Sequence, residues 1–294
     1  MGLLDFLKGL FGGEAEPPGR YGLDELARRL DMPAEELKAF KPEYQVFRMP
    51  KRTGGTREIM APNPATKMLQ KRILRRLLGR LKCHPAVMGF ERGRSVVDNA
   101  RPHVGKAVVL RMDLKDFFPA TGAKRVRTFF RKIGWDREAA DVLVRLCTHG
   151  GGLPAGAPTS PRLSNLVNHR MDARLAGLAS KLDAAYTRYA DDMTFSFKID
   201  DRKAIHAVIG MTKHIVGELG YKLHQDRKLQ IRRRHERQLV TGLVVNERPA
   251  LPRKIRRWLR AVEHNAASGW STTLSPEQLA GWQSLREMVA RKTS

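Results

Sequence analysis

The stretch from Ala184 to Phe197 constrains the fold of this chain most strongly, because apolar and polar residues alternate on both sides of two adjacent aspartates. Residues 184–187 favour a strand, and residues 193–198 alternate methionine and phenylalanine with threonine, serine and lysine. This period of two predicts a β-hairpin with Asp191 and Asp192 at its tip. Two neighbouring carboxylates repel each other, so a fold that keeps them together needs a cation there, such as a pair of magnesium ions. An ordinary solvated turn is the alternative, since aspartate is common in turns.

A third aspartate, Asp113, follows an apolar run. Residues 107–112 are apolar except for one arginine, which predicts a buried strand that ends at Asp113. A carboxylate in that place is costly unless a metal or a partner cation meets it, whereas Asp116 suits a turn or a helix N-cap. If the predicted strands are adjacent, the three carboxylates converge. Three carboxylates without histidine or cysteine ligands suit Mg²⁺, and two such ions about 3.5–4 Å apart would hold the attacking and leaving oxygens of a phosphoryl transfer.

The charge of the chain indicates a polyanionic partner. Its 294 residues include 55 basic and 30 acidic ones, a formal net charge of +25, and such an excess most simply indicates nucleic acid. An anionic membrane surface and an idle cationic surface are the alternatives. No apolar run approaches the roughly 20 residues that span a bilayer. Cys83 and Cys147 lack paired or metal-ligand spacing, which predicts reduced core residues in a cytoplasmic protein. Residues 1–11 predict a short amphipathic helix that docks on the protein or a partner.

A basic hairpin and a glycine-proline loop are candidate phosphate contacts. Residues 44–60 predict two strands around a glycine turn, and arginine can chelate phosphate oxygens of a triphosphate. The basic side chains of this hairpin are Lys51, Arg52 and Arg57. A surface hairpin with solvated charges is the alternative. Residues 149–161 predict a loop that lets a ligand approach the backbone, and they lead into a helix predicted over 162–182.

Helices are predicted for much of the remaining chain. They are two short helices between residues 23 and 40, one over 64–82 with Met68, Ile73 and Leu77 facing inward, one from Val96 to His103, two within 123–147, one over 202–219, and a basic C-terminal region. A further hairpin is predicted over 238–245. In the C-terminal region, arginines interleaved with Trp258 suit contact with a nucleic-acid backbone, and a core position for Trp258 is the alternative.

Several motifs resemble those of bacterial reverse transcriptases in order and spacing. They are residues 113–119 (DLKDFFP), 153–161 (LPAGAPTSP) with 163–165 (LSN), and 189–192 (YADD). Two further motifs resemble those of retron reverse transcriptases: residues 99–103 match NAxxH and residues 240–242 match VTG. The resemblance covers roughly residues 44–260, and five motifs in sequence are far more specific than YADD alone.

The resemblance implies an α+β fold with a right-hand polymerase architecture: fingers, a ferredoxin-like palm and a small helical thumb. We expect residues 1–43 to form an N-terminal helical extension and linker, residues 44–245 the fingers and palm, and residues 246–294 a basic helical thumb.

The resemblance also implies roles for individual residues. Asp113, Asp191 and Asp192 would be catalytic and hold two Mg²⁺ ions, and Phe118 would be the steric gate that excludes a ribose 2′-OH. The residues implied at the nucleotide are Lys51, Arg52, Arg57, Phe118, Pro154, Ala155, Gly156, Arg227 and Lys228. Ala155 stands where many relatives have glutamine, and either Arg227 or Lys228 could supply the lysine usual in the later motif. The residues expected to contact RNA or DNA are Asn99, His103, Val240, Thr241, Gly242, Arg253, Arg256 and Arg257.

The function implied by the resemblance is RNA-directed DNA synthesis from dNTPs on a cognate structured non-coding RNA. Priming from the 2′-OH of an internal guanosine would give branched RNA-linked single-stranded DNA (msDNA). The further partners implied are an accessory effector protein in anti-phage defence and a host ribonuclease H, with no membrane. Two other functions remain as alternatives. One is another bacterial defence or intron-type reverse transcriptase, and the other is a non-catalytic RNA-binding module.

Overall fold

The computed structural model describes residues 20–50, 55–224 and 229–293. The described residues pack into two compact units. The first unit contains the chain up to residue 81 together with residues 121–163, and the second contains residues 82–120 and the chain from residue 164 onward. The predicted helix at residues 1–11 lies outside the described residues. No described helix is both long and apolar enough to cross a membrane.

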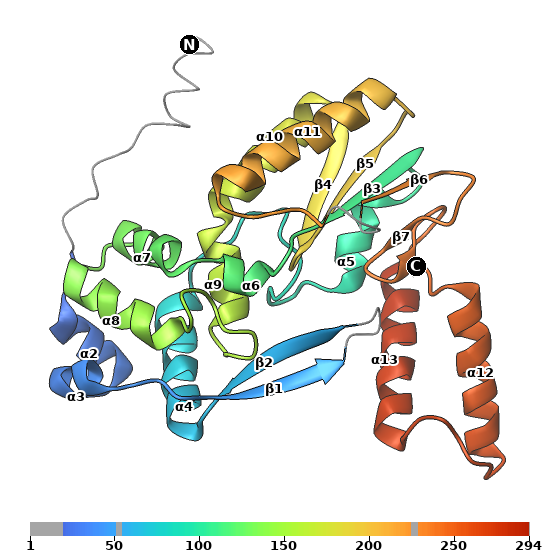
Figure 1. The fold of residues 1–294 in the computed structure, drawn as a ribbon. Coiled ribbons are helices and arrows are strands. Elements are labelled where there is room, and N and C mark those ends of the chain that lie inside the picture. Colours follow the sequence, from blue (N-terminus) through green and yellow to red (C-terminus); the bar gives the residue numbers. More distant parts are fainter. Residues whose placement is uncertain (1–19, 51–54, 225–228, 294) are drawn as a thin grey trace. The chain divides into compact units, whose positions relative to one another are not determined.

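The first unit consists of helices and one antiparallel hairpin (Figure 1). Its elements are α2 (Leu23–Leu30), α3 (Ala34–Ala39), β1 (Tyr44–Pro50), β2 (Thr56–Pro62), α4 (Pro64–Ile73), the π-helical turn η1 (Leu74–Leu78), α7 (Ala123–Lys132) and α8 (Arg137–Cys147). The hairpin predicted over 44–60 is therefore confirmed. Helix α4 begins where predicted, because the Asn63 side chain accepts a hydrogen bond from the Thr66 amide and Pro64 occupies the first turn. The inward direction predicted for Met68 is wrong: this side chain is 49% exposed, while Ile73 and Leu77 are buried.

The second unit is built on a four-stranded antiparallel sheet in the order β4-β5-β3-β6. Its strands are β3 (Val108–Asp113), β4 (Ala184–Tyr189), β5 (Asp192–Phe197) and β6 (Gln230–Arg233). Helices α10 (His169–Lys181) and α11 (Arg202–Glu218) cover one face, where the even-numbered residues of β3 join the core (Figure 1). The strands predicted on either side of the aspartates are confirmed. Strand β6 was not predicted.

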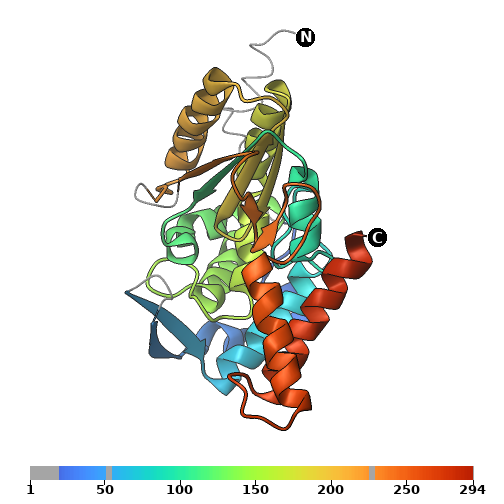
Figure 2. The same cartoon turned by 90° about the vertical axis from the view of Figure 1, so that its right-hand side faces the viewer.

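A second, smaller core lies on the other side of β3. Val109 of that strand packs there with α5 (Val96–Ala100), β7 (Leu239–Val240), β8 (Leu243–Val244) and α13 (Pro276–Thr293). Helix α12 (Arg253–Ala267) lies beside α13, as Figure 2 shows, and Trp258 packs against Trp282 with ring centroids 5.4 Å apart. The helical C-terminal region and the hairpin at 238–245 are thus confirmed.

Two helices replace the one predicted over 162–182. Helix α9 (Ser160–Val167) ends one residue before Asn168, and α10 starts one residue after it. The buried Asn168 side chain donates to the Ser164 carbonyl and to the Tyr221 hydroxyl, both at 2.8 Å. Such a side-chain bond to the preceding turn competes with the helical backbone pattern, which explains why the break falls here. Of the two cysteines predicted to lie in the core, Cys147 is buried at the end of α8, whereas Cys83 lies outside any helix and is only half-buried.

Candidate active site

The three aspartates lie together at one end of the four-stranded sheet. Asp113 ends β3 and is paired in register with Asp192, the first residue of β5. Asp191 belongs to the tight turn of the β4–β5 hairpin, in which Ala190 has a left-handed φ of 58°. The Leu114 amide donates to the Asp191 carbonyl at 3.0 Å, which fixes the turn beside the end of β3. The predicted adjacency of the two strands is therefore present, and all three aspartates are half-buried.

Basic side chains meet two of these carboxylates. Arg111 lies two residues before Asp113 on the same face of β3, and its guanidinium forms an ion pair with the Asp192 carboxylate. His224 Nε2 lies 3.7 Å from Asp113 Oδ1. Sequence reasoning missed both residues. The positive charge of Arg111 beside Asp192 offsets part of the repulsion between the adjacent carboxylates.

The donor set fits a hard divalent cation. Three carboxylates at adjacent strand ends supply the oxygen ligands that Mg²⁺ or Mn²⁺ prefers. Within the part of the chain that the structure describes, however, no three acidic, histidine or cysteine side chains are gathered into a metal-binding group. In the described structure, the Asp192 carboxylate is paired with the Arg111 guanidinium.

Phe118 lies close to Asp113 in sequence, on the short helix α6 (Phe117–Ala120). The chain turns at Asp116, whose φ of 47° is left-handed and whose carbonyl accepts from the Ala120 amide at 2.8 Å. The turn predicted at Asp116 is thus present. Phe117 is buried in the sheet core, while Phe118 is half-buried and packs against Phe117 with ring centroids 5.5 Å apart.

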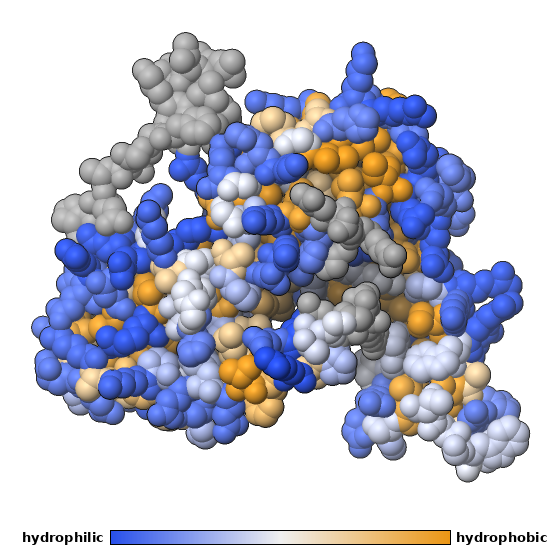
Figure 3. Space-filling model, viewed as in Figure 1, coloured by the Kyte–Doolittle hydropathy of each residue, from blue (hydrophilic) through white to orange (hydrophobic). Residues whose placement is uncertain are grey.

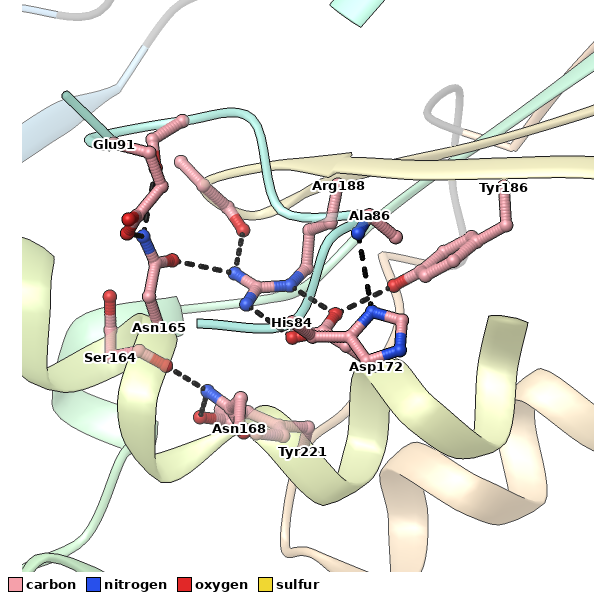
Figure 4. A network of polar contacts seen from close by, with 12 residues as sticks. His84, Ala86, Glu91, Ser164, Asn165, Asn168, Asp172, Tyr186, Arg188 and Tyr221 are labelled. Carbon is pink, nitrogen blue, oxygen red and sulfur yellow. Dashed lines mark hydrogen bonds and ion pairs between the residues drawn. The ribbon is translucent and has the colours of Figure 1, made fainter. Parts of the chain in front are cut away.

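A buried polar network beneath the hairpin supports the aspartate turn (Figure 4). Arg188 of β4 is fully buried and forms two hydrogen bonds of 2.7 Å with the Asp172 carboxylate of α10. Its remaining nitrogen donates to the Ala190 carbonyl at 2.8 Å, so this arginine holds the turn that contains Asp191. Burial alone lowers the pKa of Arg188, but the Asp172 charge outweighs burial and raises this pKa above its usual value.

Asn165 extends this network to the loop before α5. Its side-chain amide donates to the Gly89 carbonyl at 2.8 Å and to the Glu91 carboxylate at 2.9 Å, and its carbonyl oxygen accepts from Arg188 at 3.3 Å (Figure 4). Asn165 belongs to the LSN motif, but the sequence did not indicate its partners, since they lie 23 and 74 to 76 positions away.

Comparison with known proteins agrees with this architecture. The family model for reverse transcriptase (RNA-dependent DNA polymerase) matches residues 49–244. The Retron Ec86 reverse transcriptase of Escherichia coli is 34% identical over 238 residues, which cover 81% of this chain and 73% of that relative. The chain belongs to the retron-type reverse transcriptases. The Retron Mx65 enzyme of Myxococcus xanthus is 40% identical over 242 residues, or 76% of this chain.

Length and fold comparisons add two facts about this retron-type chain. It spans 56% of the Mx65 reverse transcriptase and 59% of the Mx162 reverse transcriptase of the same organism, which is less than two thirds of either. A solved telomerase from Candida albicans, in complex with a TWJ fragment of telomeric RNA, shares the fold at a TM-score of 0.50 and 12% identity. The match covers 80% of this chain and 52% of the telomerase chain. The mixed α and β fold is thereby confirmed.

Some of the residues predicted to bind the nucleotide belong to the first unit of this reverse transcriptase. Arg57 is exposed on β2, and the 154–156 loop packs against the same strand, because the Met60 amide donates to the Ala155 carbonyl at 2.6 Å. Gly156 has φ +123° and a Cβ there would lie 2.8 Å from the Met60 carbonyl, so only glycine fits. Pro154 is buried. Lys51, Arg52, Arg227 and Lys228 lie outside the described residues.

The two retron motifs contact each other in the second unit. The Asn99 amide reaches Thr241 Oγ1 at 3.4 Å, and this hydroxyl donates to the Val96 carbonyl at 3.1 Å. The VTG turn uses left-handed conformations at Thr241 (φ 45°) and Gly242 (φ 83°), while Val240 is buried in the smaller core. The structure therefore gives Asn99 and Val240 packing positions. Their contact with nucleic acid stays a prediction.

His103, the last residue of NAxxH, lies entirely inside the second unit. One ring nitrogen is 2.7 Å from Ser196 Oγ on β5, and the other is 2.8 Å from Thr187 Oγ1 on β4. Burial, with a smaller contribution from the Lys106 charge, lowers the pKa of His103 to about 3, so the ring is neutral. The described position attaches the NAxxH segment to the sheet, and a nucleic-acid contact of this side chain stays a prediction. By contrast, Arg253, Arg256 and Arg257 of α12 are exposed.

Proposed function

We propose that this chain is an RNA-directed DNA polymerase that copies part of a cognate structured non-coding RNA into single-stranded DNA. The observation that carries the proposal is the register of β3 and β5, which brings Asp113 beside Asp192 and the Asp191 turn within a reverse transcriptase fold. Asp113, Asp191 and Asp192 would hold two Mg²⁺ ions, which when bound supply the charge stabilisation for phosphoryl transfer.

The side chains around the aspartates have complementary roles in this proposal. Phe118 excludes the ribose 2′-OH and thereby selects dNTPs. Arg57, with Lys51 or Arg52, binds the triphosphate, the 154–156 loop lines the nucleotide, and Arg227 or Lys228 assists it. Arg111 neutralises Asp192 when no cation is bound, since the two side chains already form an ion pair.

The retron relatives favour a dedicated RNA partner. In this proposal, synthesis starts from the 2′-OH of an internal guanosine and gives branched msDNA. The VTG turn, the NAxxH segment and the α12 arginines contact the RNA. The protein is cytoplasmic, acts with an accessory effector in anti-phage defence, and relies on a host ribonuclease H to remove template. A defence or intron-type enzyme without its own RNA is the second candidate, and the nucleic acid that copurifies with the protein distinguishes the two.

The decisive test replaces one carboxylate of the hairpin tip. We expect Asp191→Asn to abolish DNA synthesis while RNA binding persists, because the variant removes one charge and leaves the fold of the turn. Asp183→Asn is the matched control. Asp183 lies before the start of the same hairpin, is 77% exposed, and has a left-handed φ of 48° that asparagine also adopts. Equal synthesis by the Asp191 and Asp183 variants would contradict the proposed mechanism and favour a non-catalytic RNA-binding module.

A further inference from the structure

Phe90 has a backbone conformation that large side chains rarely adopt. Its φ is +62°, in the left-handed region, and its side chain is nevertheless 45% exposed. A left-handed phenylalanine is a conformational outlier, and it persists only where surrounding contacts enforce it. A half-exposed ring contributes less to a core than a buried one, so core packing alone does not explain why this ring is held here.

The residues on both sides of Phe90 are attached to the hairpin that carries the aspartates. The Met88 amide donates to the Arg188 carbonyl at 2.8 Å, and Asn165 binds both the Gly89 carbonyl and the Glu91 carboxylate. Gly89 approaches the turn so closely that a Cβ there would lie 2.7 Å from the Ala190 nitrogen. Phe90 is therefore positioned relative to Asp191 by backbone contacts and by the network of Figure 4.

The ring of Phe90 contacts two aromatic residues of the candidate site. Its centroid is 6.1 Å from that of Phe118 and 6.4 Å from that of Tyr189, the tyrosine of YADD. Phe118 in turn packs on Phe117, whose ring lies 5.5 Å from the Arg188 guanidinium. Phe90 thus connects the proposed gate to the aspartate hairpin through ring contacts in the preferred distance range.

A steric gate excludes a 2′-OH only if its ring cannot turn aside. Phenylalanine has two rotatable side-chain bonds, so neighbouring groups must restrict Phe118, and Phe117 and Phe90 are ring contacts that do so. We propose that Phe90 is a positioning residue for sugar selection, which acts by holding Phe118 in place. This inference rests on the proposed role of Phe118 as the gate.

The test measures kcat/KM for a dNTP and for the matching rNTP with full-length protein. Phe90→Gly removes the ring and is compatible with the left-handed backbone, so it separates loss of the ring from misfolding. We expect it to reduce discrimination against the rNTP by about 3- to 10-fold, the size of one aromatic pair. Phe90→Tyr keeps the ring and should therefore retain the parent's discrimination against the rNTP. Met211→Ala on α11 is the control, since Met211 is also 45% exposed.

Phe118→Ala and the double variant separate the two proposals. We expect Phe118→Ala to lose discrimination and Phe90→Gly to add nothing in its background, because the ring acts through Phe118. Unchanged discrimination in Phe90→Gly, or additive effects in the double variant, overturns the inference about Phe90 alone. Unchanged discrimination in Phe118→Ala overturns the gate assignment, and the inference fails with it.

Discussion

Gly89 lies against the tip of the β4–β5 hairpin, so a substitution at this residue tests whether the close approach positions the turn that contains Asp191. A Cβ at residue 89 would lie 2.7 Å from the Ala190 nitrogen and 3.2 Å from the Tyr189 Cα, both backbone atoms that cannot move independently of the turn. We expect Gly89→Ala to displace the turn and to destabilise the protein by about 1–3 kcal/mol. We also expect it to reduce the rate of DNA synthesis by more than the loss of folded protein alone would explain. Primer extension and thermal unfolding measure the two effects.

Gly177→Ala is the control for this substitution. Gly177 lies within α10, and a Cβ there would have no neighbour within 4 Å. Alanine is favoured over glycine in a helix by about 1 kcal/mol, so this variant should be as stable as the parent or more stable, with full activity. If the two variants behaved alike, the close approach at Gly89 would not be what positions the turn.

Residue types alone predicted the aspartate site but not its supports. Asp113 and the Asp191–Asp192 pair were recognisable because an apolar run and a period of two mark the strands that carry them. Arg188 and Asp172 gave no such signal. Each looks like an ordinary surface charge in sequence, and only the fold buries both completely and joins them. Pairing of this kind depends on long-range contacts that a local pattern does not contain.

At the scale of elements, His103 joins the end of the 3₁₀ helix η2 (Arg101–His103) to two strands of the sheet. Since burial lowers its pKa from 6.5 to about 3, an unfolded chain takes up a proton below pH 6.5 that the folded chain does not. The neutral His103 ring therefore adds to the free energy of unfolding at neutral pH, and this contribution is lost as the pH falls from 6.5 toward 3. We expect a loss of roughly 2 kcal/mol between pH 7 and pH 5 from this residue.

The measurement is the free energy of unfolding of the parent and of His103→Gln across this pH range. Glutamine has no charge to gain, so the variant should be less stable at pH 7 but should lose less stability on acidification. Other titrating groups contribute equally to both proteins and cancel in the difference. Parallel curves would mean that His103 takes up a proton as readily in the folded protein as in the unfolded chain.

The elements that sequence reasoning missed are those set by their neighbours. The sequence of β6, Gln-Ile-Arg-Arg, has one apolar residue, and it forms a strand because it pairs with residues 108–111 of β3. Similarly, the exposed Met68 belongs to an apolar stripe in sequence, but the face that α4 buries carries Thr66, Leu69, Gln70 and Ile73. Pairing and packing decided these cases over local preference.

At the scale of the whole chain, the charge of +25 bears on the proposed binding of RNA rather than on the fold, and the face drawn in Figure 3 is predominantly hydrophilic. Binding that neutralises phosphates releases counterions, so the affinity for RNA should fall steeply with salt. We expect the slope of log K against log salt to be as steep for Asp191→Asn as for the parent, since the role proposed for the hairpin tip is chemistry and not phosphate contact.

Substitution of the arginines of α12 tests whether the salt dependence of RNA affinity comes from this one surface. Replacing Arg253, Arg256 and Arg257 by alanine should reduce the salt slope by about 2–3, because each phosphate contact contributes roughly 0.7–0.9. The control replaces Arg202, Lys203 and Lys213, which are exposed on α11 and carry the same total charge. A specific α12 surface predicts a change in slope only for the first variant. Equal changes in both would mean that the RNA responds to net charge alone, and the predicted contact of α12 with RNA would be wrong.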